Sequence, residues 1–266
     1  MSDYRERKAL IGGGAVVWTR TAGAGPQRVL PDGCTDLIWS GTGPDGELIV
    51  AGPDTRAHLA FGPPGTRAVG LRFAPGAGPA VLGVPAHELR DLRVPLAALW
   101  PDAEVRRLAE RIAERTAERT AGRAAERIAE RNTGRAAERN TGWETAPGRV
   151  LEEAALGRLR TAEPPDPVLA AIVAGASRGT GVAGIAAAVG LGERQLHRRS
   201  LAAFGYGPKT LGRVLRLNRA LDLARTGVRF AEVAATAGYA DQAHLAREVR
   251  TLTGVPLSRL LAAPGG

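Results

Sequence analysis

An internal repeat near the carboxyl end constrains the fold of this chain more than any other feature. Two stretches align with an offset of 48 residues and a one-residue gap before Leu196, IAAAVGLGERQ-LHRR from Ile185 and VAATAGYADQAHLARE from Val233. In each, a helix of small residues ends at a glycine, Gly190 or Gly238, and a second helix begins near an acidic residue. Small residues let two helices cross closely, glycine accepts the left-handed backbone of a helix end, and a carboxylate favours the positive end of the next helix. This order is typical of a helix-turn-helix, and its two copies predict a double helix-turn-helix domain.

The second helix of each copy is predicted to read DNA in the major groove. Leu196 and Leu245 are the expected apolar anchors, and they turn the polar side chains of these helices away from the core. Arg with guanine and Gln with adenine are pairings that the major groove favours. The expected reader positions are Arg194, His197 and Arg198 in the first copy and Gln242, His244 and Arg247 in the second. For each of them the alternative is a solvated helix face, because phosphate contacts commonly outnumber base contacts.

The positive charge of the chain is concentrated in the same segment. The formal net charge is +9, and residues 175–266 carry +8 of it, with 13 Lys or Arg against 5 Asp or Glu. Clustered positive charge neutralises phosphates, so we expect double-stranded DNA as the partner. An acidic membrane surface could also use such charge. No apolar run approaches the ~18 residues of a membrane span and no secretion leader is recognisable, so we expect a cytoplasmic protein without membrane contact.

A long helix is predicted between the two copies, over residues 208–225. Pro208 suits its first turn, and its apolar residues recur at helical spacing. Such a helix is a rigid spacer that can hold two readers about 34 Å apart, one turn of duplex. Lys209, in its first turn, completes the predicted DNA-binding set. The arginines at 213, 216 and 219 are expected to face either the DNA backbone or solvent.

These motifs resemble the AraC family of transcription regulators over about 95 residues. The resemblance rests on IAAAVGLGERQLHRR, on AFGYGPKTLGRVLRLNRAL and on GYADQAHLAREVRTLTGVPLSRL. It implies two readers joined by a long helix, and it places base contacts at Arg194, His197 and Arg198 and at Gln242, Ala243, His244 and Arg247. The chain departs from the family at Ser200 and Val249, where a large core residue is usual, so looser packing is expected there.

The amino-terminal part is expected to be β-rich. Residues 15–73 contain short apolar runs separated by turn pairs such as Pro31-Asp32-Gly33, which favours an antiparallel sandwich or barrel. Short helices are expected from Gly78 onward, with Pro85 and Pro95 in or before their first turns. The stretches RVLPDGCTDLIW, VAGPDTRA and PAVLGVP also resemble the amino-terminal domain of a subset of these regulators, which implies a cupin-like sensor. The predicted class is therefore α+β.

A low-complexity segment separates the two parts. Residues 104–142 repeat Ala-Glu-Arg triplets, which predicts a helix at least to Arg131, with breaks at 132–134 and 140–142 and a second helix near 148–160. Large apolar residues are too few to sustain a coiled-coil seam, so a solvated helix or linker is favoured over a dimerisation element. The predicted domains are 1–100, a β-rich sensor, 101–165, the low-complexity segment and linker, and 166–266, the DNA-binding domain. Asp166 and Pro167 are expected to open the last of these.

Candidate functional residues of the amino-terminal part are Asp32, Cys34, Asp36, Trp39 and Arg72, which could line a small-molecule pocket. We expect no catalytic residue, no metal site and no cofactor, because the chemistry-bearing residues, His58 and His87 among them, form no known spacing. The alternatives are a Cys-His nucleophilic pair and a mononuclear metal site, whose partners can be distant in sequence. A lone buried thiol behaving as an apolar residue is the expectation for Cys34.

Two other functions compete with a ligand-responsive, sequence-specific regulator. One is a cupin-like enzyme with a basic tail that localises it to nucleic acid, which would depend on Cys34 or His58. The other is an architectural binder that uses charge alone. RNA polymerase, a small-molecule effector and a second copy of the chain are further partners that the sequence leaves open.

Overall fold

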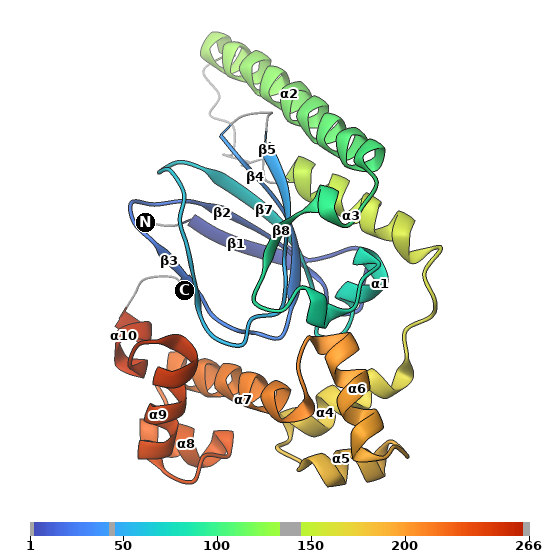
Figure 1. The fold of residues 1–266 in the computed structure, drawn as a ribbon. Helices are drawn as coiled ribbons and strands as arrows, with labels where there is room; N and C mark the ends of the chain where they lie inside the picture. Colours follow the sequence, from blue (N-terminus) through green and yellow to red (C-terminus); the bar gives the residue numbers. More distant parts are fainter. Residues whose placement is uncertain (1–2, 43–45, 134–144, 263–266) are drawn as a thin grey trace.

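The computed structural model describes residues 3–42, 46–133 and 145–262, with side chains described outside 3, 119–133 and 145. A β-rich amino-terminal domain lies above a helical carboxyl-terminal domain in Figure 1. The predicted α+β class is confirmed.

The amino-terminal domain is built on a six-stranded antiparallel sheet in the order β1-β2-β7-β4-β5-β8. A second, two-stranded sheet of β3 and β6 is also antiparallel (Figure 1). The strands are β1 (Asp3–Lys8), β2 (Val16–Thr21), β3 (Gln27–Val29), β4 (Thr35–Gly41), β5 (Gly46–Ala51), β6 (His58–Ala60), β7 (Arg67–Phe73) and β8 (Arg93–Pro95).

The two faces of the large sheet differ in character because side chains alternate along each strand. On β4, Leu37 and Trp39 enter the apolar core, whereas Asp36 lies on the opposite face. On β7, Leu71 is in the core and Arg72 is on the face of Asp36, its direct neighbour across the β4–β7 pair.

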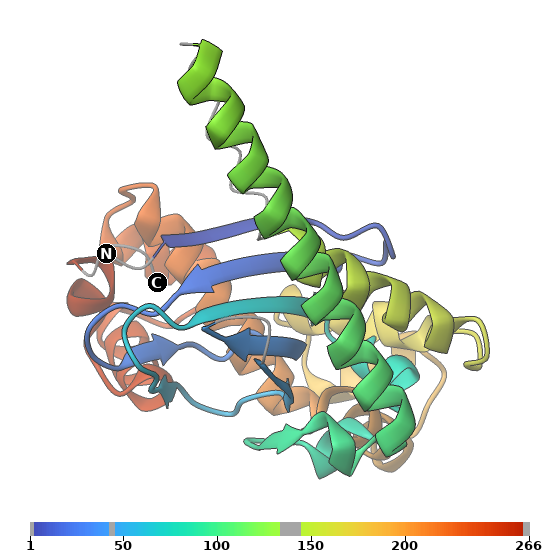
Figure 2. The ribbon, with the colours of Figure 1, turned by 90° about the horizontal axis from the view of Figure 1, so that it is seen from above.

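Helices cover the apolar face of the large sheet (Figures 1 and 2). After β7 follow α1 (Gly78–Leu82), the 3-10 turns η1 (Ala86–Glu88) and η2 (Leu96–Ala98), α2 (Asp102–Thr133) and α3 (Thr145–Leu159). Leu108 and Ile112 of α2 and Leu151 of α3 are buried in the same core as the strands. The first turns of α2 therefore pack on the domain, and its remainder extends beyond the sheet, as Figure 2 shows.

The ion pair of Arg7 and Glu152 fastens α3 to the edge of the sheet. The two side chains form two hydrogen bonds of 3.0 and 2.7 Å, and Glu152 also accepts from the backbone N of Leu10. Glu152 is 1 % exposed, so its charge is satisfied by these partners rather than by water.

The carboxyl-terminal domain consists of seven helices within the described residues. They are α4 (Pro167–Ser177), α5 (Val182–Ala188), α6 (Glu193–Phe204), α7 (Pro208–Arg225), α8 (Phe230–Ala237), α9 (Gln242–Thr253) and α10 (Leu257–Ala262). They form two apolar clusters, one with α4, α5 and α6 and one with α8, α9 and α10. Both clusters include residues of α7, which crosses from one to the other in Figure 1.

Most of the elements predicted from sequence are present. The helix over 208–225 has the predicted bounds, and the Asp166 side chain caps α4 by accepting a hydrogen bond from the backbone N of Val168. The short helices expected after Pro85 and Pro95 are single 3-10 turns. The helix of the low-complexity segment runs to Thr133, and the break expected at 140–142 lies outside the described residues.

Candidate nucleic-acid interface and the amino-terminal polar cluster

The pair α5 and α6 places a polar helix face at the surface. Close packing of small residues holds α4 against α5, where a Cβ on Gly175 would come within 2.9 Å of Ile185. Leu196 of α6 is fully buried, and Gln195 accepts a hydrogen bond from the backbone N of Gly192 at the start of α6. The side chains of Arg194, His197 and Arg198 are exposed, and the His197 ring lies against Gly207, just before the start of α7.

The pair α8 and α9 repeats this arrangement. α8 ends at Gly238, in the left-handed region at φ 83°, and the Asp241 side chain caps α9 by accepting from the backbone N of His244 at 2.6 Å. Leu245 is 1 % exposed. Gln242, Ala243 and Arg247 are exposed.

His244 is placed differently from the other expected readers. Its Nδ1 accepts a 3.3 Å hydrogen bond from the backbone N of Ala240, and its ring meets the Tyr239 ring edge-on at 5.3 Å. The Arg216 guanidinium lies over the same Tyr239 ring, 4.8 Å from its centre. His244 is thus partly buried within the turn between α8 and α9.

The long helix α7 joins the pairs and carries charged side chains that are used inside the domain. Arg213 forms two 3.0 Å hydrogen bonds with Glu248 of α9. This bonding lowers the pKa of Glu248 and raises the pKa of Arg213. Of the arginines expected to face DNA or solvent, Arg213 and Arg216 therefore contact α9 and Tyr239, whereas Arg219 is exposed. Lys209 is exposed in the first turn.

Ser200 and Val249, where looser packing was expected, are both completely buried. Val249 lies in the apolar cluster of the second pair. The Ser200 hydroxyl is buried without a hydrogen-bond partner among the described residues. An unpaired buried hydroxyl is unfavourable, so Ser200 carries a hydrogen-bonding cost in the first pair that the apolar Val249 does not carry in the second.

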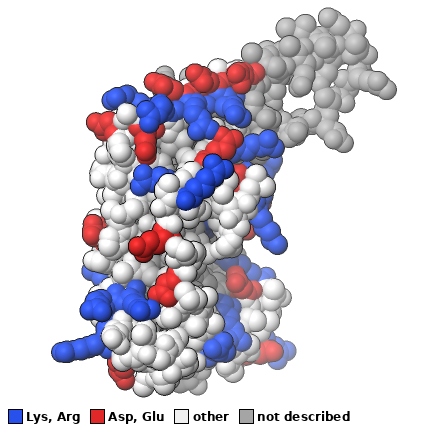
Figure 3. All heavy atoms as spheres, turned by 90° about the vertical axis from the view of Figure 1, so that its right-hand side faces the viewer, with Lys and Arg blue, Asp and Glu red and all other residues white. Residues whose placement is uncertain are grey.

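Charge is distributed unevenly along the chain, because residues 175–266 carry +8 of the formal +9. On the face drawn in Figure 3, Lys and Arg side chains project from the lower end, where the carboxyl-terminal domain lies, with some acidic side chains among them. A surface of this kind favours phosphate contact at the helical domain.

Four of the five residues predicted to line a ligand site lie close together in the amino-terminal domain. Asp36 accepts hydrogen bonds from the Arg72 Nε at 3.1 Å and from the Trp18 Nε1 at 2.5 Å. Asp32 lies 3.3 Å from the Arg72 Nε and accepts from the backbone N of Cys34. Both carboxylates are thus paired with the Arg72 guanidinium within the protein. Trp39, the fifth, lies in the apolar core on the other face of the sheet.

Burial shifts the titration of this cluster. It raises the pKa of Asp36, and it raises the pKa of the Cys34 thiol, an effect that Asp32 adds to. Although burial disfavours its charge, Arg72 has a raised pKa because Asp36 and Asp32 lie beside it. The cluster therefore keeps Arg72 charged and the Cys34 thiol protonated at neutral pH.

Two residues of this region were not singled out from the sequence. Trp18 is a donor to Asp36, and Tyr206 of the α6–α7 turn points its hydroxyl at the turn of Gly33, 3.5 Å from where a Cβ there would stand. Trp18 alternates with core residues of β2, which is the one signal that could have placed it on the face of Asp36. Tyr206 belongs to another domain, and no local pattern indicates its contact.

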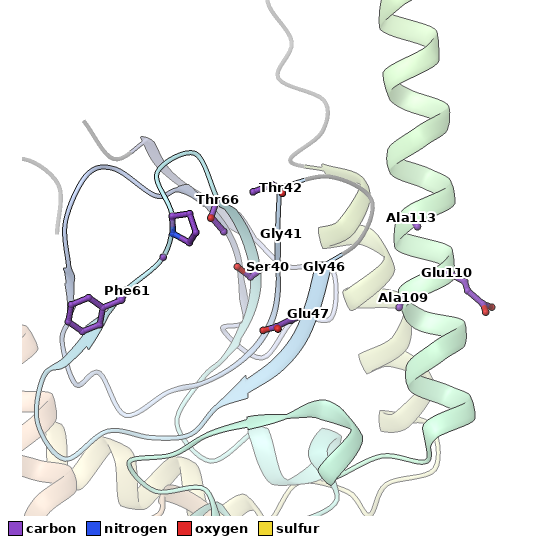
Figure 4. Close-up of a pocket in the computed structure, with 12 residues that line it drawn as sticks. Ser40, Gly41, Thr42, Gly46, Glu47, Phe61, Thr66, Ala109, Glu110 and Ala113 are labelled. Atoms are coloured by element: carbon purple, nitrogen blue, oxygen red, sulfur yellow. The ribbon is translucent and has the colours of Figure 1, made fainter.

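A hollow of about 740 Å³ opens at the far end of the β domain, between the strands and α2 (Figure 4). Its polar side chains include Ser40, Thr42, Glu47 and Thr66, and Phe61 lies across from them. Phe61 is 77 % exposed. None of the five predicted ligand residues lines this hollow.

Two domain families match the sequence. The family described as a helix-turn-helix domain matches residues 185–263, from α5 through α10, and the family described as a domain of unknown function (DUF6597) matches residues 15–95. The carboxyl-terminal domain is an AraC-type helix-turn-helix domain. This match places a helix-turn-helix domain of the kind that binds DNA at the carboxyl end of the chain.

Solved structures of ToxT from Vibrio cholerae are similar to the chain. A fatty-acid-bound wild-type ToxT has 10% sequence identity and a TM-score of 0.47, with 96% of each chain covered. ToxT bound to (E)-4-(8-methylnaphthalen-1-yl)but-3-enoic acid has 9% identity and a TM-score of 0.46, with 97% of this chain and 98% of ToxT covered. No curated protein matches the sequence.

Within the described ranges, no group of three His, Cys, Asp or Glu side chains is placed to hold a metal ion. Over the same part of the chain, no helix has both the length and the apolar character needed to cross a membrane.

Proposed function

We propose that the chain is a transcription regulator of the AraC type and that it reads a two-part site on double-stranded DNA, with α6 and α9 as its two reader helices. The observation that carries the proposal is the repeated geometry: each helix is anchored by a buried leucine, Leu196 or Leu245, and exposes polar side chains over its first turns. By its rise per residue, α7 is about 27 Å long, a length suited to hold readers in successive major grooves.

The proposed base contacts follow from chemistry and exposure. Arg194, His197 and Arg198 serve in the first reader, and Gln242, Ala243 and Arg247 serve in the second, where Arg offers a bidentate pairing to guanine and Gln to adenine. His244 acts by shaping the turn before α9, where its ring is packed against Tyr239. Lys209 contributes a phosphate contact.

Selection of bound oligonucleotides from a random pool, with the purified full chain, tests this proposal. Recovery of two sequence elements about one helical turn apart is the expected result. Arg198→Ala and Arg247→Ala should each relax preference at one base position, at a cost of about 1–3 kcal/mol. Arg199→Ala is the matched control, because Arg199 of α6 is paired with Asp166 instead. A loss that is uniform over all sequences would contradict base reading.

The charge-only alternative makes a different prediction. An architectural binder loses affinity steeply with salt and binds selected and scrambled duplexes alike. The enzyme alternative predicts a turnover activity that is lost on changing Cys34 or His58. Cys34 precedes β4 and is bonded within the polar cluster, whereas His58 is exposed at the start of β6.

We also propose that the amino-terminal domain responds to a small molecule. The hollow beside α2 supports this, because it combines hydroxyl groups with an exposed aromatic ring. The alternative ligand site is the set predicted from the sequence, which consists of Asp32, Cys34, Asp36, Trp39 and Arg72. Thermal-shift screening of a metabolite panel should use the full chain, because α2 and α3 complete the core of the domain. A shift abolished by Ser40→Trp assigns the ligand to the hollow, and the absence of any shift would argue against the proposal.

A further inference from the structure

The carboxyl-terminal ends of the two reader helices are both in contact with the amino-terminal domain. α6 ends at Gly205 and α9 ends at Gly254, which are corresponding positions of the two helix pairs. The polar faces proposed to read DNA lie on the opposite, amino-terminal halves of these helices. The amino-terminal domain therefore touches each reader where DNA does not.

At the end of α6, the contact combines an arginine with close packing. The Arg90 Nη1 donates a 3.3 Å hydrogen bond to the carbonyl of Gly205. A Cβ on Gly205 would come within 2.6 Å of the Pro53 Cγ and 3.2 Å of the Ala86 carbonyl oxygen, so the two backbones meet closely.

At the end of α9, another arginine makes the corresponding contact. The Arg28 Nη1 donates a 2.6 Å hydrogen bond to the carbonyl of Thr253. The backbone N of Ala57 donates to the carbonyl of Leu252, also at 2.6 Å. The last carbonyls of a helix have no partner within it and carry partial negative charge, so a guanidinium is a favourable cap at both ends.

The loop that reaches both readers is itself held firmly. Pro53 touches the first reader and Ala57 the second, and between them Asp54 forms an ion pair with Arg93. The Thr55 backbone N and hydroxyl donate to the carboxylate of Asp91. Between the readers, the Asn218 Nδ2 of α7 donates to the carbonyl of Pro31 at 3.2 Å.

We propose that the amino-terminal domain fixes the orientation of the two readers by holding the end of each, through Arg90 on α6 and Arg28 on α9, and so sets the spacing of the DNA elements that the chain accepts. The proposal rests on the proposed two-reader function. Within the carboxyl-terminal domain, α7 joins the two helix pairs. The amino-terminal domain contacts both pairs as well, so α7, the two pairs and this domain form a closed ring of contacts. Such a ring resists rotation of either pair relative to α7.

A fixed ring favours one spacing of the DNA elements. When one reader is bound, the other has a high effective concentration only at the position that the geometry allows. A looser ring spreads that concentration over neighbouring positions. Loss of the arginine contacts therefore lowers the penalty for a changed spacing more than it lowers affinity for the original site.

Binding to spacer variants of the selected duplex tests the proposal. The proteins are the full chain, Arg28→Gln, Arg90→Gln and the double variant, and the duplexes carry none, one, two or three inserted base pairs between the elements. We expect insertion of base pairs to weaken binding of the wild-type chain by about tenfold or more. For the double variant, we expect this loss of affinity to be smaller than the wild-type loss by a factor of about three or more. Arg56→Gln is the matched control. Arg56 is exposed and lies between Pro53 and Ala57 in the loop that reaches both readers, and its substitution removes the same charge as Arg28→Gln or Arg90→Gln.

The outcomes separate this proposal from the proposed function. Equal spacing penalties in the double variant and the wild type would overturn it, as would a uniform loss of affinity at every spacing together with a lowered melting temperature. Arg28→Lys and Arg90→Lys keep the charge and a donor, so they should restore the wild-type penalty. A wild-type chain that selects no two-element site would instead refute the two-reader function, and this inference with it.

Discussion

At the scale of single residues, Asp36 is the most constrained group in the amino-terminal domain. It lies directly opposite Arg72 across the β4–β7 pair and also accepts from Trp18. Its 9 % exposure leaves these partners to replace water. A buried charge that is paired in this way is costly to disturb, because removing one partner leaves the other uncompensated.

Asp36→Ala should therefore destabilise the chain by about 3 kcal/mol or more, because Arg72 and Trp18 lose their acceptor. The measurement is the free energy of unfolding in urea, followed by tryptophan fluorescence. Asp32→Ala is the control. The Asp32 side chain is 32% exposed, and its loss leaves Asp36 paired, so a smaller effect is expected. An equal or smaller loss for Asp36→Ala would show that the cluster does not depend on it.

The sequence indicated Asp32, Asp36 and Arg72 as unusual, but it did not indicate how they are used. Their ion pairs depend on the register of strands that are 36 residues apart, and alternation within a strand does not determine that register. Trp39 is a different case. It lies three residues from Asp36 on the same strand, so alternation along β4 is enough to place the two side chains on opposite faces.

At the scale of elements, the helix pairs were well predicted because their ends depend on local chemistry. Gly238 ends α8, Asp241 caps α9, and Pro208 begins α7, each by a preference that acts within a few residues. The sequence did not indicate the strand β1, and it indicated short helices where the structure has 3-10 turns. A single turn or an edge strand that carries charged residues has too little periodicity to reveal it.

Substitution by alanine should change the stability of the chain in opposite directions at two glycines. Gly157 lies exposed within α3, and Gly238 ends α8 at φ 83°, and a Cβ on either would meet no atom within 4 Å. Gly157→Ala should stabilise the chain by about 0.5–1 kcal/mol, since alanine loses less backbone entropy. Gly238→Ala should destabilise it by about 1–2 kcal/mol, because L-residues disfavour the left-handed region. Melting temperatures of the two variants that shift in the same direction would contradict this explanation.

The contact of α7 with α9 should depend on pH through Glu248. The hydrogen bonds from Arg213 lower the pKa of Glu248 in the folded state, so their stabilisation is present above the ordinary glutamate pKa of 4.5 and is lost as pH falls through the folded value. For this partly exposed pair, a coupling of about 1 kcal/mol is expected at neutral pH. A double-mutant cycle of Arg213→Ala and Glu248→Gln measures it. A coupling that is unchanged well below the glutamate pKa would count against the ion pair.

At the scale of the whole molecule, the contacts between the domains were beyond the reach of the sequence. The low-complexity segment predicted a solvated helix, and its first turns instead complete the core of the β domain with Leu108 and Ile112. The contacts at Gly205 and Thr253 join residues that are more than 100 positions apart, and no periodicity connects them. Such packing arises only when both surfaces are folded.

Gly205 offers a measure of the interface between the domains. Its φ of 82° and the 67° of Gly190 impose a similar backbone strain on alanine, but only at Gly205 would the new Cβ meet the other domain, at Pro53. Gly205→Ala should therefore cost about 1–3 kcal/mol more than Gly190→Ala, the usual cost of forcing a methyl group into a packed contact. Urea unfolding of both variants gives this difference, and faster proteolysis of the 160–167 connection in Gly205→Ala would show that the domains have separated. If both variants lose the same stability and are cleaved alike, the amino-terminal domain does not restrain the end of α6.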